Sequence, residues 1–299
     1  MNRAAAGATM TSMEGLIALL DLERIEENLF RGISLDPGWQ RVFGGQVIAQ
    51  ALVAAQRTVP LERPVHSLHG YFLRPGDPEA PILYEVERIR DGGSFTTRRV
   101  VAVQRAQAIF TLSASFQVAE PGLEHQAAMP AVPGPEELPG GEDLTRLLLQ
   151  NAPEPIRRYW TRPRPIEFRP VLLDHYLTTD KLEPVQRIWV RTLTPFTGDP
   201  ALGAAVLAYL SDMTLLDTAL FAHGLSVFDA RIQAASLDHS MWFHHPVDLS
   251  DWLLYAQDSP SSSGGRGLTR GSLFTRNGVL LASVAQEGLI RPKRGASFS

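Results

Sequence analysis

The chain contains the same pattern of residues twice. The string HGYFLRP at 69–75 has a counterpart in SMWFHHP at 240–246, and Leu83-Tyr84 follows the first string as Leu254-Tyr255 follows the second. The offset between the two copies is 171 residues at both landmarks. Landmarks that recur at a nearly constant offset are typical of a duplicated structural unit. We therefore expect two similar halves built from one supersecondary pattern.

Each copy is predicted to hold one helix and several strands. Residues 43–56 place apolar side chains at intervals of three to five, which indicates a helix. A shift of 169 residues predicts the second helix to begin at Asp212, at the head of DMTLLDTALFAHG. Alternating apolar residues follow in both copies, and Asn277-Gly278 is a preferred two-residue hairpin turn. One helix packed on an antiparallel sheet in each half is an α+β architecture.

A proline-rich segment separates the two copies. Ten of the 22 prolines lie between Pro121 and Pro170, and a proline lacks the N–H donor that a central strand needs. We expect an N-terminal unit over 14–119, a linker over 120–165 and a C-terminal unit over 166–292. Leucines at helical spacing predict a short helix within the linker, over Asp143–Gln150.

Composition excludes several classes of function. The net charge is −4, so no basic field indicates binding to nucleic acid or to a membrane surface. The chain of 299 residues has no cysteine, which excludes disulfides, thiolate metal sites and cysteine nucleophiles. No apolar run reaches the roughly 18 residues that a membrane span requires. The prediction is a cytoplasmic protein.

Several long strings resemble the acyl-CoA thioesterase II family, from about Leu16 to Arg291. They are RVFGGQVIAQAL (41–52), VHSLHGYFLRPGD (65–77), GGSFTTRRV (92–100), SLDHSMWFHHP (236–246), WLLY (252–255) and VAQEG (284–288). The resemblance implies a double hot-dog fold, in which two tandem units join their sheets into one continuous sheet. It also implies hydrolysis of medium-chain or long-chain fatty acyl-CoA without a cofactor, and assembly into homodimers or homotetramers.

The resemblance further implies three catalytic residues, which together orient the hydrolytic water. The matching positions are Asp212, Ser236 and Gln286, and better-known members of the family carry threonine where this chain has Ser236. A thioester has a good leaving group, so an oriented water and donors for the oxyanion suffice without a covalent intermediate. A buried carboxylate is a suitable proton acceptor for that water. Each of the three also has an ordinary structural reading; for Asp212 that reading is a helix N-cap.

The substrate-binding residues are predicted less directly. Gly44 and Gly45 lie at a helix N-terminus that can receive a carbonyl oxygen, or they simply allow close packing. His66 is either a second base or a buried, hydrogen-bonded histidine. Arg98 and Arg270 are candidates for the phosphates of coenzyme A, because arginine binds phosphate in a bidentate manner.

A metal site is not expected, and three other functions compete with hydrolysis by an activated water. The spacings of His239, His244 and His245 fit neither a helix nor a strand metal motif. A serine hydrolase would need a G-x-S-x-G elbow, which the sequence lacks. The resemblance to hot-dog hydratases and dehydratases would require an aspartate followed about five residues later by a histidine in one helix. Five residues after Asp212, position 217 is Asp and not histidine. A non-catalytic acyl-CoA binding protein stays open, because Ser236 departs from the family pattern.

Overall fold

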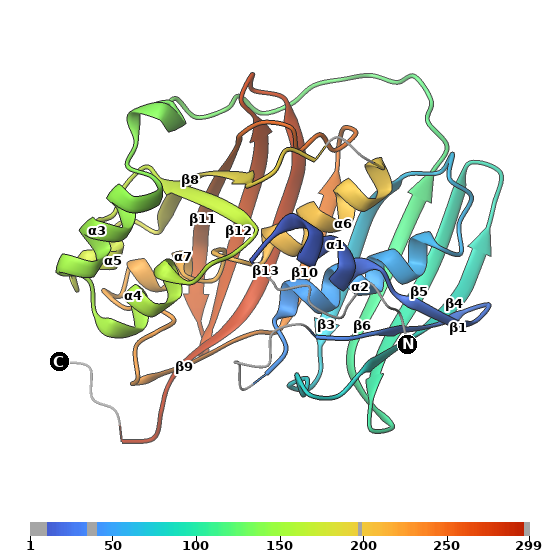
Figure 1. Cartoon of the computed structure of the whole chain (residues 1–299), viewed down its shortest axis with the longest axis horizontal. Coiled ribbons are helices and arrows are strands. Elements are labelled where there is room, and N and C mark those ends of the chain that lie inside the picture. The colour runs from blue at the N-terminus through green and yellow to red at the C-terminus, as the bar shows by residue number, and fades with distance from the viewer. Residues whose placement is uncertain (1–10, 35–40, 197–198, 296–299) are drawn as a thin grey trace.

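The computed structural model describes residues 11–34, 41–196 and 199–295. In these ranges, thirteen strands form one sheet, with the order β1-β2-β4-β5-β6-β3-β10-β13-β12-β11-β8-β7 and β9 paired to β13. The strands are β1 (Glu23–Glu26), β2 (Leu29–Gly32), β3 (Val65–Phe72), β4 (Ile82–Asp91), β5 (Phe95–Gln104), β6 (Gln107–Gln117), β7 (Ile166–Pro170), β8 (Val185–Thr192), β9 (Ile232–Ser236), β10 (Asp238–Phe243), β11 (Leu253–Ser263), β12 (Arg266–Thr275) and β13 (Leu280–Pro292). The predicted α+β fold with one continuous sheet is confirmed (Figure 1).

The seam between the halves shows the duplication directly. Strands β3 and β10 are antiparallel neighbours, and Ser240 lies opposite His69. Nδ1 of His69 lies 3.1 Å from Oγ of Ser240. Because these two residues occupy the same position in the two copies, the approximate two-fold axis passes between them. The predicted repeat is therefore a structural repeat.

Two long helices lie on the same face of the sheet, near its middle (Figure 1). Helix α2 (Gly44–Gln56) belongs to the N-terminal half and α6 (Pro200–Ser211) to the C-terminal half. Small residues dominate both helices, so the helices pack closely on the sheet and on each other. The core of the molecule lies between this pair and the sheet.

The second helix lies earlier in the chain than the repeat offset predicted. Asp199 accepts a hydrogen bond from the N–H of Ala201 at 2.9 Å, and Pro200 occupies the first turn, so α6 begins there. The prediction that a helix begins at Asp212 is wrong: α6 ends at Ser211, and Asp212 is its C-cap residue. The apolar residues that follow form a turn and the short helix α7 (Thr218–Phe221).

Besides α7, five further helices lie in the described part of the chain. They are α1 (Met13–Leu20), η2 (Pro135–Glu137), α3 (Gly141–Asn151), α4 (Glu154–Thr161) and α5 (Asp174–Leu177). Helix α3 includes the residues for which a short helix was predicted. The chain after β6 runs as an extended segment from one half to the other before reaching η2 (Figure 1). In the described part of the chain, no helix is both long and apolar enough to cross a membrane.

Candidate active site

The C-terminus of α6 meets the N-terminus of α2, and Asp212 lies between them. Its carboxylate accepts a hydrogen bond from the backbone N–H of Gly45. The N-cap residue of α2, Phe43, has no capping side chain, so the negative charge at this helix end comes from the other half of the chain. The positive end of the α2 dipole stabilises that charge, whereas the α6 dipole opposes it.

The two glycines of α2 are required by this close approach. A Cβ atom at Gly44 would lie 2.6 Å from Oδ2 of Asp212, and one at Gly45 would lie 2.4 Å from the carbonyl oxygen of Tyr209. Both distances are shorter than a van der Waals contact. Only glycine therefore lets the start of α2 touch the end of α6.

Two further polar side chains reach Asp212 from the sheet. Ser236, the last residue of β9, directs its hydroxyl toward Oδ1 of Asp212 at 3.5 Å. Gln286 of β13 donates from Nε2 to Oγ of Ser236 at 2.9 Å. Strands β9 and β13 are hydrogen-bonded neighbours, with Ser236 opposite Gly288. The three residues predicted from the family resemblance thus come together, although up to 74 positions separate them along the chain.

A cavity of about 550 Å³ opens beside Asp212 and Ser236. Its apolar lining comes from both halves and includes Phe43, Val47, Phe72, Ile109, Phe110, Tyr209, Met213, Val227 and Phe228. Gly44 also lines it, whereas Gln286 lies just behind Ser236. The volume is in the range of ordinary small-molecule sites. Asp212 and Ser236 thus form a polar patch on the wall of a mostly apolar cavity.

Burial raises the pKa of Asp212 to about 7. The N–H of Gly45, the side chains of Gln286 and Ser236, and the charge of Arg41 oppose this effect, because each favours the ionised carboxylate. A carboxylate with a pKa near 7 is suited to accept a proton at neutral pH. Asp212 therefore has the electrostatics of a general base.

A second buried carboxyl group, that of Asp217, lines the same cavity. Burial raises its pKa to about 7 as well, opposed by the backbone N–H of Val227. Within the described residues, its Oδ1 atom has no hydrogen-bond partner. Asp217 thus has the same raised pKa as Asp212 but lacks the serine and glutamine.

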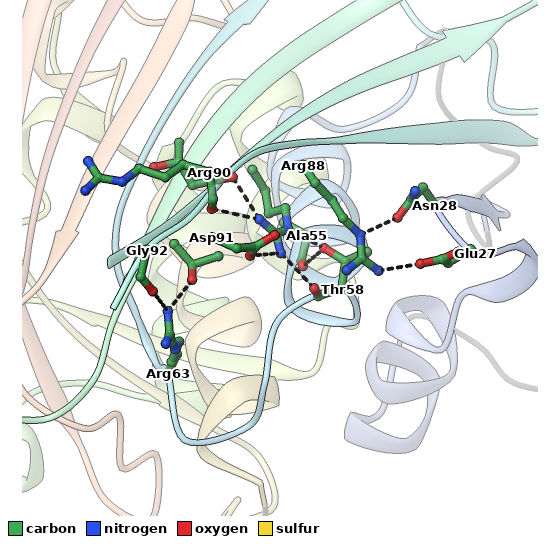
Figure 2. Close-up of polar contacts among 12 residues, drawn as sticks. Glu27, Asn28, Ala55, Thr58, Arg63, Arg88, Arg90, Asp91 and Gly92 are labelled. Carbon is green, nitrogen blue, oxygen red and sulfur yellow. Dashed lines mark hydrogen bonds and ion pairs between the residues drawn. The ribbon is translucent and has the colours of Figure 1, made fainter. Parts of the chain in front are cut away.

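Among the residues predicted to bind substrate, Gly44 lines this cavity, whereas the other four do not: Gly45, His66, Arg98 and Arg270. The guanidinium of Arg98 is fully buried and donates hydrogen bonds to Thr58 and Asp91. These bonds connect the C-terminus of α2 to the sheet. Figure 2 shows Thr58 and Asp91 at that end of the helix.

Arg270 and His66 lie elsewhere on the sheet. Arg270 forms a two-point ion pair with Asp258 of the neighbouring strand, at 2.9 and 2.8 Å. Nε2 of His66 lies 2.8 Å from Oγ of Ser115. The hydrogen-bonded reading of His66 is therefore the one that the structure favours.

Four arginines line the cavity, and the sequence did not predict any of them as a binding residue. They are Arg41, Arg74, Arg162 and Arg164. Arg41 and Arg74 are exposed, so they lie where the cavity opens to solvent. The guanidinium of Arg164 lies over the ring of Tyr159, with 4.6 Å between carbon and ring centroid. The one available sequence signal was the position of Arg41, three residues before the Gly44-Gly45 pair.

Comparison with known proteins gives a consistent result. Residues 158–289 match the family described as acyl-CoA thioesterase, and residues 35–117 match the acyl-CoA thioesterase N-terminal domain. Acyl-CoA thioesterase 2 of Haemophilus influenzae is 42% identical over 93% of this chain and 98% of its own length. Human acyl-coenzyme A thioesterase 8 is 43% identical over 94% and 90%. The crystal structure of acyl-CoA thioesterase II TesB2 from Mycobacterium marinum has a TM-score of 0.77 and 44% identity, over 95% of this chain and 99% of that one.

Proposed function

Because this chain belongs to the acyl-CoA thioesterase family, we propose that it hydrolyses medium-chain or long-chain fatty acyl-CoA to free fatty acid and coenzyme A. The relatives are named as acyl-CoA thioesterases, which makes the chain a thioester hydrolase. The observation that carries the proposal is the meeting of Asp212, Ser236 and Gln286 at the wall of an apolar cavity.

In the proposed mechanism, a water lies beside Asp212 and attacks the thioester carbonyl carbon. The carboxylate accepts one proton of the water as the C–O bond forms, and Ser236 and Gln286 hold the reacting groups in place. The first N–H groups of a helix have no partner within it, and we assign that of Gly44 as a donor to the oxyanion. Collapse of the tetrahedral intermediate breaks the C–S bond, and the proton passes from Asp212 to the thiolate.

The cavity supports a division of the substrate. The apolar lining suits a fatty acyl chain, since its burial there removes apolar surface from water. The exposed arginines at the opening, Arg41 and Arg74, are suited to the phosphates of coenzyme A. The proposed assembly into homodimers or homotetramers is supported by exposed Tyr71 and Trp242 beside the seam of the sheet. Location in the cytoplasm stays a prediction.

Thiol release from acyl-CoA of different chain lengths tests the proposal. We expect steady release with medium or long chains, followed with a chromogenic disulfide reagent that cannot react with this cysteine-free protein. With trans-enoyl-CoA as substrate, any fall in absorbance should be matched by an equal release of thiol, because hydration removes the absorbance without releasing coenzyme A. Binding of acyl-CoA without release at any chain length would overturn the proposal in favour of a binding protein.

The pH dependence of hydrolysis should report the titration of Asp212. We expect kcat/KM to fall tenfold for each pH unit below about 7, because a protonated carboxyl cannot accept the proton of the water. Asp217 has a similar pKa, so Asp217→Asn is the matched control and should keep this limb. If the acid limb disappeared in Asp217→Asn, the general base would be Asp217 and the assignment of Asp212 would be wrong.

A further inference from the structure

A chain of buried polar side chains continues behind the three proposed catalytic residues. Oε1 of Gln286 lies 2.6 Å from Nδ1 of His239, and Nε2 of His239 lies 2.9 Å from Oγ of Ser211. His239 and Ser211 are completely buried, so neither touches the cavity. The whole chain runs from Ser211 through His239, Gln286 and Ser236 to Asp212.

We propose that His239 is a positioning residue, which fixes the amide orientation of Gln286 so that every hydrogen bond in the chain points toward Asp212. The inference rests on the proposed function, since it concerns the same hydrolytic step. His239 lies within one of the strings that resemble the family, but the resemblance described above assigns it no catalytic or binding role.

The orientation of Gln286 decides what Asp212 faces. A carboxamide has nearly the same shape when its oxygen and nitrogen exchange places, but the donors become acceptors. In the observed orientation, Nε2 donates to Ser236, which leaves the hydroxyl hydrogen of Ser236 free for Oδ1 of Asp212. In the reversed orientation, Oε1 would accept that hydrogen. Asp212 would then face the lone pairs of Ser236, which repel a carboxylate.

The imidazole selects between these orientations. Burial lowers the pKa of His239 to about 4, so the ring is neutral at pH 7 and carries one N–H. When the hydrogen is on Nδ1, it is donated to Oε1 of Gln286, and Nε2 accepts the hydroxyl hydrogen of Ser211.

The other tautomer gives the opposite direction. Oγ of Ser211 also lies 2.9 Å from the carbonyl oxygen of Ala208, and its single hydrogen can serve only one acceptor. A hydrogen on Nε2 would turn Ser211 toward Ala208 and force Gln286 to reverse. Asp212 is the ionised end of the chain, and hydrogen bonds to a carboxylate are roughly twice as strong as neutral ones. This favours the hydrogen on Nδ1.

Two substitutions at one position test the inference. His239→Phe keeps a planar ring but removes both nitrogens, so Gln286 is free to reverse. We expect kcat to fall about 30-fold to 100-fold with KM within about threefold, because misplaced catalytic groups typically cost about 10² in rate. His239→Asn places an N–H near the position of Nδ1, and it should recover most of that loss.

The pH profile separates positioning from general damage. Without the hydrogen from Ser236, the pKa of Asp212 rises, so the acid limb of kcat/KM should move to higher pH in His239→Phe and return in His239→Asn. The other titratable groups that interact electrostatically with Asp212 are Arg41, Tyr159 and Tyr255. All variants retain these three residues.

The control is His244→Phe, which removes another histidine bonded to a serine, away from the cavity. It should hydrolyse acyl-CoA at the parent rate with an unmoved limb. A parent protein without thiol release would defeat the proposed function itself. An active parent with an equally active His239→Phe would overturn this inference alone, and so would equal losses in His239→Phe and His239→Asn with both limbs unmoved.

Discussion

Replacing Asp212 by asparagine should lower kcat about 10³-fold and leave acyl-CoA affinity within a few-fold. The amide keeps the shape of the side chain and can still accept the N–H of Gly45, but it cannot accept the proton of the attacking water. General base catalysis contributes typically about 10² to 10⁴ in rate. Single-turnover thiol release and equilibrium binding of a non-hydrolysable acyl-CoA thioether measure the two quantities separately.

Asp217→Asn is the matched control for this substitution. Asp217 lines the same cavity with the same raised pKa, yet Ser236 and Gln286 do not contact it in the described structure. Its loss of kcat should stay below about tenfold, since it removes no proton acceptor from the proposed mechanism. Equal losses in the two variants would contradict the assignment of Asp212 as the base.

As the pH rises, the stability contributed by Asp212 should fall while the activity that depends on it rises. The pKa of Asp212 is raised in the folded state from 3.8 to about 7, so its stabilising contribution is complete below pH 4 and is lost as the pH rises through 7. Asp212→Asn lacks this pH dependence. The unfolding temperature of the variant minus that of the parent should therefore be larger at pH 8 than at pH 4.

The repeat was predictable because it depends on residues at fixed spacing. The landmarks at offset 171 place His69 opposite Ser240 on the seam, so the sequence contains the two-fold arrangement of the sheet. The three proposed catalytic residues also come together as the family resemblance implied. Their catalytic roles stay a prediction until the substitutions are measured.

Other parts of the site could not be found by spacing. The repeat predicted a helix start at Asp212 because the two halves differ in length between helix and strands, and only the Asp199-Pro200 pair indicates where α6 begins. Arginines are frequent in this chain, and nothing in their local sequence shows which ones face a cavity. Ser211 and His239 act through contacts between distant elements, which no local pattern records.

Helix α2 connects the predicted site with Arg98, which was predicted to bind substrate and lies at the other end of the helix. Its N-terminus receives the carboxylate of Asp212, and its C-terminus receives the guanidinium of Arg98, whose Nη2 donates to the carbonyl oxygen of Thr58 at 3.0 Å. An anion at the N-terminus and a cation at the C-terminus both complement the helix dipole. Arg98 therefore contributes to holding the helix whose first turn contacts the proposed base.

Arg98→Met should destabilise the protein by about 3 to 5 kcal/mol, because buried hydrogen-bond partners lose their donor, while leaving the kcat/KM of the folded fraction within about twofold. The guanidinium donates to Thr58 Oγ1 at 2.9 Å, to the carbonyl oxygens of Arg90 and Thr97, and to Asp91 at 2.6 Å (Figure 2 shows Thr58, Arg90 and Asp91). Methionine fills part of the space but leaves the buried oxygens of Thr58 without this donor, which costs about 1 to 3 kcal/mol for each such group. Thermal unfolding should shift downward by roughly 6 to 15 °C.

Arg270→Met provides the comparison, because Arg270 was predicted for the same substrate-binding role. Its ion pair with Asp258 is exposed, and exposed pairs typically contribute about 0 to 1 kcal/mol, so the unfolding temperature should move by less than about 3 °C. Both variants should hydrolyse acyl-CoA with an unchanged KM at a temperature where they are folded. If instead Arg98→Met raised KM without lowering the unfolding temperature, Arg98 would bind substrate, and the structural role derived from its buried hydrogen bonds would be wrong.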